Sequence, residues 1–131
     1  MFFRIESANG LAIYEQIVRQ VKFAVAGEAL LAGDLVPSVR ELSRDLAINP
    51  NTVARAYREL QAEGILAPLR GTGLEVTPHA AKHCGDERVT LIRERLRSVL
   101  LEARRSRLEL DEIRKLIDEE LARLEKKGKT P

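Results

Sequence analysis

Apolar residues recur at helical spacing near the start of the chain. The residues that share this face are Ile13, Ile17, Val21, Ala24 and Val25. They predict a helix that starts near Ala12 and weakens at Gly27, since glycine lowers helix stability. Before this helix, Phe2 and Ile5 are compatible with a short edge strand.

A short second helix is predicted after a turn at Gly33 and Asp34. Ser38 stands three residues before Glu41, which is the spacing of a capping box. In that motif each side chain bonds the backbone amide of the other residue at the start of a helix. This helix should end near Ala47.

A third helix is predicted directly afterwards. Asn49 is suited to cap it, and Pro50 has the backbone angle of a first helical position. Its inward face would hold Val53, Ala56, Tyr57 and Leu60, and its other side Asn51, Thr52, Arg55 and Arg58. Two helices separated by about three residues must turn sharply, which is the helix-turn-helix arrangement.

The pattern changes to that of strands after Gly64. Residues 65–69 and 74–77 flank the turn Arg70-Gly71-Thr72-Gly73, which predicts a β-hairpin. Such a hairpin beside a helix-turn-helix is a wing, so residues 1–78 are interpreted as a winged helix-turn-helix domain. Residues 79–86 are small and polar without a period, and we interpret them as a linker.

Helical periodicity returns in the last third of the chain. The apolar positions are Val89, Ile92, Leu96 and Val99, followed by Ile113, Leu116, Ile117, Leu121 and Leu124. We expect residues 87–127 to form two helices in an antiparallel hairpin, followed by a frayed terminus at 128–131. Because two helices cannot cover both apolar stripes, these residues are expected to form a homodimer, the commonest closed assembly. The fold class is therefore mainly α with a small β-hairpin.

Several segments together resemble the winged-helix domain of the GntR family of bacterial regulators. They are residues 33–42, residues 49–60, Glu63-Gly64 and the turn at residues 70–73. The short tail is most similar to that of the YtrA-like subfamily, in which a pair of helices forms the dimer. This similarity gives no reason to expect a small-molecule effector pocket or a cofactor in the tail. Ala47 departs from the family, which usually has glycine in this turn.

The resemblance implies a sequence-specific transcription regulator, most often a repressor, that binds double-stranded DNA as a homodimer at a near-palindromic operator. The helix after Asn49 would enter the major groove, with Asn51 and Arg55 at base edges. The phosphates would be contacted by Ser38, Arg40, Arg44, Thr52 and Arg58. The wing would approach the minor groove with Arg70, Gly71, Thr72 and Gly73.

The overall charge does not by itself indicate nucleic-acid binding. The net charge is +2, yet the residues up to Pro78 carry eight lysines and arginines against nine acidic residues. Phosphate attraction must therefore come from a local patch.

Cys84 is the single cysteine, and no apolar run approaches the roughly 20 residues of a membrane span. A cytoplasmic protein without membrane association is expected.

Other functions are less well supported by the residues. A winged helix can also serve as a protein-protein interaction module without DNA specificity, but such a module would expose apolar residues where Asn51, Arg55 and Arg58 stand. No catalytic set of serine, histidine and aspartate is present, so no enzyme is expected. His79, His83 and Cys84 lie close together but lack a second group of ligands, and we expect no metal site.

Overall fold

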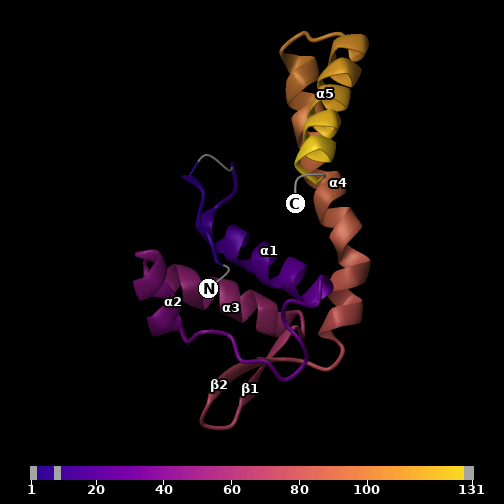
Figure 1. The fold of residues 1–131 in the computed structure, drawn as a ribbon. Coiled ribbons are helices and arrows are strands. Elements are labelled where there is room, and N and C mark those ends of the chain that lie inside the picture. The colour runs from indigo at the N-terminus through magenta and orange to yellow at the C-terminus, as the bar shows by residue number, and fades with distance from the viewer. Residues whose placement is uncertain (1–2, 8–9, 129–131) are drawn as a thin grey trace. The chain divides into compact units, whose positions relative to one another are not determined.

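The computed structural model describes residues 3–7 and 10–128. The chain forms two compact units, Met1–Val89 and Thr90–Pro131, and the boundary between them lies within a long helix. The elements are three helices, a β-hairpin and two long C-terminal helices (Figure 1). The expected mainly helical class, with a winged helix-turn-helix followed by two helices, is confirmed.

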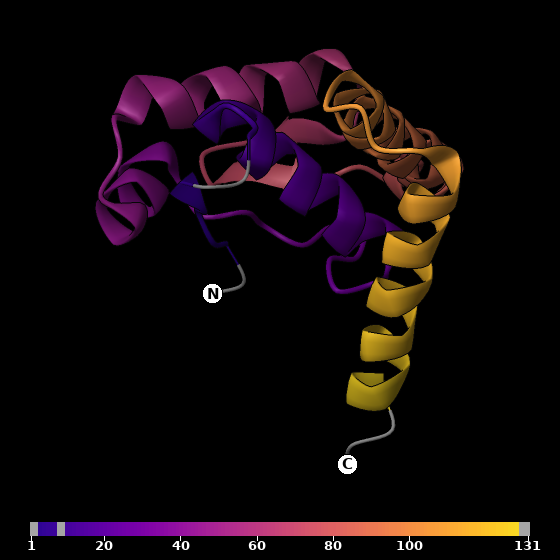
Figure 2. The ribbon, with the colours of Figure 1, turned by 90° about the horizontal axis from the view of Figure 1, so that it is seen from above.

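Helix α3 lies at the centre of the first unit. It spans Pro50–Ala62 and packs against α1 (Ile13–Ala26), against α2 (Val39–Leu46) and against the first strand of the hairpin. Figures 1 and 2 both show α1 and α3 side by side. The largest fully buried side chains of this core include Ile17, Val21, Leu42, Val53, Leu60 and Ile65. The apolar positions that indicated each helix therefore form one shared core.

The wing is an antiparallel hairpin of β1 (Leu66–Leu69) and β2 (Gly73–Val76). A third extended segment pairs with β2, through a bridge between Leu35 and Glu75. The Val36 amide donates to the Leu74 carbonyl at 3.1 Å, which continues this pairing. The sheet partner thus comes from the segment before α2.

Residues 3–7 form no strand, so the expected edge strand at Ile5 is wrong, and Phe2 lies outside the described residues.

The segment predicted as a linker at 79–86 is helical from Ala80 onward. Helix α4 runs without interruption from Ala80 to Arg105. Ala80 and Cys84 are one helical turn apart, and both are buried in the core of the first unit. The prediction was wrong because burial of this face stabilises a helix that the small, polar composition does not indicate.

The two tail helices leave most of their apolar residues uncovered. Helix α5 spans Leu110–Gly128, and the connecting turn includes Arg107 with a φ of 65°. Figure 2 shows α4 nearly end-on, with α5 extending away from it. Ile113 is buried, whereas the other eight residues predicted for dimerisation are 37–64% exposed. The frayed end predicted at 128–131 lies outside the described residues, apart from Gly128, which closes α5.

Among the residues that the structure describes, no helix combines the length and apolar character needed to cross a bilayer.

Candidate nucleic-acid interface

The start of α2 is fixed by the predicted capping box. The Glu41 amide donates to Ser38 Oγ at 3.0 Å, and the Ser38 amide donates to Glu41 Oε1 at 3.3 Å. Hydrogen bonds with the Ser38 side chain and backbone lower the pKa of Glu41 below its usual value. The helix therefore begins at a defined residue, which places Arg40 and Arg44 on an exposed face of α2.

The turn between α2 and α3 is tight and contains a left-handed residue. Ala47 has a φ of 54°, and the Ile48 amide donates to the Ser43 carbonyl at 3.0 Å. Asn49 Oδ1 then accepts from the Asn51 amide at 2.8 Å, and Pro50 is the first residue of α3. The predicted caps are confirmed, and they set the direction in which α3 leaves the turn.

Tyr57 connects α3 to the segment before α2. Its side chain is 2% exposed, and its hydroxyl donates to the Pro37 carbonyl at 2.7 Å. Burial raises the pKa of Tyr57 well above its ordinary value, so the hydroxyl stays protonated and able to donate. Tyr57 is therefore a core residue, as its inward position predicts, and it holds the two helices of the motif together.

The exposed face of α3 is polar. Asn51, Arg55 and Arg58 are all exposed, while Val53, Ala56 and Leu60 on the opposite side are buried. Thr52 is half-buried. Within the described ranges, no carboxylate lies at ion-pair distance from the arginines at positions 40, 44, 55, 58 or 70. These five arginines are therefore not engaged in ion pairs, although the charge of Arg44 acts on Glu41 one turn earlier in α2.

Arg55 has an aromatic neighbour that the sequence pattern does not indicate. Its Cζ atom lies 3.7 Å from the centre of the Tyr14 ring. Tyr14 belongs to the first turn of α1 and lies 41 positions before Arg55 in the chain. No local pattern could have indicated this pair, because it depends on how α1 packs against α3.

The wing turns through a compact three-residue loop. The Thr72 amide donates to the Leu69 carbonyl at 2.9 Å, and Thr72 Oγ1 donates to the Arg70 carbonyl at 3.0 Å. Gly71 and Gly73 have φ values of 71° and 119°, which favour glycine. Arg70 is exposed at this tip. The loop therefore carries one cation beside backbone that has no side chain to obstruct it.

The structure brings the wing tip close to the start of α2. Thr72 and Gly73 line a hollow of about 420 Å³ together with Ser38 at the N-terminus of α2. Glu41 and Asp45 line the same hollow. Because carboxylates repel phosphate, an approaching nucleic-acid backbone is better accommodated at the rim of this hollow than within it.

Within the described residues, His79, His83 and Cys84 do not bring their ligand atoms together. Cys84 is buried in the core, and burial raises its pKa to about 11, so the thiol stays protonated. His83 instead lies near Glu63 and Glu87. Lys22 Nζ donates to one oxygen of each of these carboxylates at 3.0 Å. The Lys22 ammonium thus forms an ion pair with each of the two carboxylates near His83.

Comparison with known proteins identifies relatives along most of the chain. Residues 13–76 match the family described as "Bacterial regulatory proteins, gntR family". The HTH-type transcriptional repressor YtrA of Bacillus subtilis is 36% identical over 116 residues, which is 88% of this chain and 89% of that protein. The similarity extends beyond the winged helix into the tail.

Solved structures agree with this assignment. A structure described as a transcriptional antiterminator from Listeria monocytogenes EGD-e has a TM-score of 0.63 and 31% identity, and covers 91% of this chain and 89% of its own. YtrA from Sulfolobus acidocaldarius, a GntR-family transcription factor, has a TM-score of 0.55 and 31% identity, over 70% of this chain and 94% of its own. The chain belongs to the GntR family of DNA-binding transcription regulators, which are not enzymes.

Proposed function

We propose that this regulator is a cytoplasmic repressor that binds a near-palindromic operator as a homodimer. The observation that carries the proposal is the exposed polar face of α3, with Asn51, Arg55 and Arg58 directed away from the core. The buried centre of a protein-protein interface is usually richer in apolar and aromatic side chains than this face is. Sequence-specific DNA is the better match for this face.

The major groove is read by the first two turns of α3. Arg55 donates two hydrogen bonds to guanine O6 and N7, because its planar guanidinium matches this pair of acceptors. Asn51 is suited to adenine, which offers one donor and one acceptor at the same edge. Both residues lie toward the N-terminal part of α3, the part of a helix-turn-helix that reaches base edges.

Phosphate contacts hold α3 in the groove. Arg40 and Arg44 on α2 and Arg58 on α3 are exposed cations that neutralise phosphates on either side of the groove. Ser38 and Thr52 add neutral hydrogen bonds to phosphate oxygens from the starts of the two helices. These contacts set affinity and register, and they carry no base preference of their own.

The wing contacts the neighbouring minor groove. Arg70 supplies the positive charge, and Gly71 and Gly73 allow the backbone on either side of Thr72 to approach the DNA closely. A narrow minor groove has enhanced negative potential and attracts arginine. The wing therefore adds affinity and a preference for groove shape.

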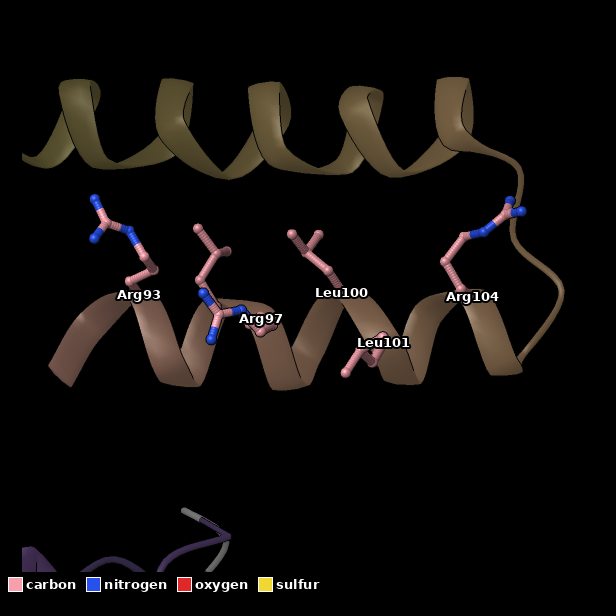
Figure 3. Close-up of a pocket in the computed structure, with 6 residues that line it drawn as sticks. Arg93, Arg97, Leu100, Leu101 and Arg104 are labelled. Atoms are coloured by element: carbon pink, nitrogen blue, oxygen red, sulfur yellow. The ribbon is translucent and has the colours of Figure 1, made fainter. Parts of the chain in front are cut away.

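The tail forms the dimer. Eight of its nine predicted interface residues are 37–64% exposed in the single chain, which is unfavourable in water for two helices rich in leucine and isoleucine. Helix α4 also carries a groove of about 280 Å³, whose lining residues are Arg93, Leu96, Arg97, Leu100, Leu101 and Arg104. In Figure 3, Arg93, Leu100 and Arg104 point toward α5. A second copy would cover the apolar part of this surface.

Repression is the expected outcome of binding. The relative that matches 88% of this chain is named a transcriptional repressor. A dimer bound across a promoter blocks the access of other proteins without needing any catalytic group. The proposal therefore requires only the DNA-binding face and the dimer.

Single substitutions test the division between base and phosphate contacts. Arg55→Ala is expected to lower affinity for the operator by about 1–3 kcal/mol and to relax one base position. Arg40→Ala should weaken binding to all duplexes and lower the salt slope by about one. The measurement is DNA affinity at several salt concentrations, on operator and on scrambled duplex. Equal losses on both duplexes for Arg55→Ala would assign Arg55 to the backbone.

A further inference from the structure

Arg55 is the one DNA-facing arginine of the described residues whose guanidinium lies over an aromatic ring. Its Cζ atom is 3.7 Å from the centre of the Tyr14 ring. The second cation-ring contact, between Arg19 and Phe23, lies within α1 and has a longer separation of 5.2 Å. The proposed base-reading residue is thus distinguished from the arginines that are assigned to phosphates.

The Tyr14 ring is itself held in place. It packs against the buried core of the first unit, and its hydroxyl donates to Glu15 Oε1 at 3.2 Å. Helices α1 and α3 make the most extensive helix-helix contact of that unit. The ring is therefore a fixed platform attached to one helix, and the arginine rests on it from another.

Stacking of this kind restricts the arginine without using its hydrogen-bond donors. At 3.7 Å from the ring centre, the guanidinium carbon is too close for an N–H group to point straight at the ring, which favours stacking of the guanidinium face on the ring. The N–H groups lie in the plane of the guanidinium, so they remain directed away from the ring. An exposed arginine otherwise samples many rotamers, and ordering it on binding lowers affinity.

We propose that Tyr14 is a positioning residue that preorganises Arg55 for base recognition. This inference rests on the proposed role of Arg55 in reading bases. Only the base-reading arginine needs such positioning, because a bidentate contact with a base requires a defined guanidinium orientation. A phosphate accepts a cation from many directions, so Arg40, Arg44 and Arg58 need no such platform.

The test is a double-mutant cycle with a conservative control. Tyr14→Leu removes the ring, Tyr14→Phe keeps it, and each is combined with Arg55→Ala in the full chain. Affinity is measured on a duplex selected by the unmodified protein and on a scrambled duplex. Tyr14→Leu should lower affinity for the selected duplex about two- to five-fold, the effect of an exposed cation-π contact, and leave the scrambled duplex unchanged. Tyr14→Phe should retain the original preference.

The double variant separates a positioning role from a structural one. In the Arg55→Ala background, Tyr14→Leu should cause no further loss. The same loss in both backgrounds would make Tyr14 merely structural and would overturn the inference. Arg55→Ala is expected to lose discrimination between the selected and the scrambled duplex. If Tyr14→Leu keeps this discrimination, the inference about Tyr14 is overturned, while the proposed function stays intact. Equal losses of Arg55→Ala on both duplexes would remove the base-reading role and this inference with it.

A direct readout of the stack does not depend on DNA. In the free protein, the Arg55 side-chain protons should show an upfield ring-current shift in NMR spectra. The shift should persist in Tyr14→Phe and disappear in Tyr14→Leu. Arg55→Lys provides a second variant if Tyr14→Leu does not fold, because lysine keeps the charge but cannot stack as a plane. It should lose operator preference, and unchanged preference would contradict the inference.

Discussion

Ala47 shows how one residue sets the geometry of the DNA-binding motif. Its φ of 54° ends α2 and lets the chain enter α3 within a few residues. A side chain at a left-handed position is strained, because Cβ comes too close to the following carbonyl. The sequence indicates this position, since alanine stands where the family usually has glycine. The structure confirms that the angle is positive.

Replacing this residue by glycine should stabilise the protein. Ala47→Gly removes the strain, which outweighs the greater flexibility of glycine in the unfolded chain, and we expect a gain of about 1 kcal/mol in the free energy of unfolding. Urea unfolding of the two proteins measures the difference. Ala54→Gly within α3 is the matched control and should destabilise by a similar amount. A loss of stability in Ala47→Gly would show that the turn is unstrained.

At the scale of elements, Lys22 joins three helices. It lies on α1, and its ammonium bonds Glu63 at the C-terminal end of α3 and Glu87 in the second turn of α4. Burial by itself lowers the pKa of Lys22, but the hydrogen bonds and charges of the two carboxylates more than offset this, so its pKa is raised. The ion pairs thereby hold the start of α4 against the winged helix.

Lys22→Met should destabilise the protein in a pH-dependent way. It leaves two carboxylates close together and partly buried, and we expect a loss of about 2 kcal/mol near neutral pH. Because the folded pKa lies above the unfolded value of 10.5, the stabilisation is complete below pH 10.5 and is lost as pH rises through the folded pKa. Unfolding free energies of both proteins from pH 7 to 11 test this. If the difference in unfolding free energy between the original protein and Lys22→Met grows above pH 10.5, the proposed role of the Lys22 ion pairs is contradicted.

Local signals predicted the helices well, and contacts distant in sequence decided the rest. Ser38, Glu41, Asn49 and Pro50 defined the starts of α2 and α3 because caps act within one turn. The sequence did not predict the helical start of α4, because this start depends on contacts between residues distant in sequence. Glu87 bonds Lys22 of α1, and Ala80 and Cys84 pack into the core of the first unit. The pairing of Leu35 with β2 and the stacking of Arg55 on Tyr14 are likewise non-local.

At the scale of the whole molecule, the uncovered tail is the strongest argument for a second copy. One copy of α3 alone would read only a few base pairs. Linking two copies raises the overall affinity for DNA without any new contact. The exposed stripe on α4 and α5 provides the means of linking them. We therefore expect dimerisation and operator affinity to be lost together.

A charge in this stripe should separate the copies. Leu121 is 53% exposed in the single chain, so Leu121→Glu should leave the monomer folded and place a charge in the proposed dimer interface. Operator affinity should fall about 100-fold or more as avidity is lost. Sedimentation and DNA binding measure the two effects, with Glu119→Gln as the control on the same helix. A variant that remains dimeric would place the interface elsewhere.

The most direct test of the central claim is selection of bound fragments from random DNA by this chain, at two salt concentrations. The account predicts an inverted repeat whose half-sites are centred about one helical turn apart and which persists at the higher salt. The same selection with Arg55→Ala should return the repeat with one position of each half-site degenerate. No enriched sequence, or an unchanged motif with Arg55→Ala, would contradict the claim that the exposed face of α3 reads DNA sequence through Arg55.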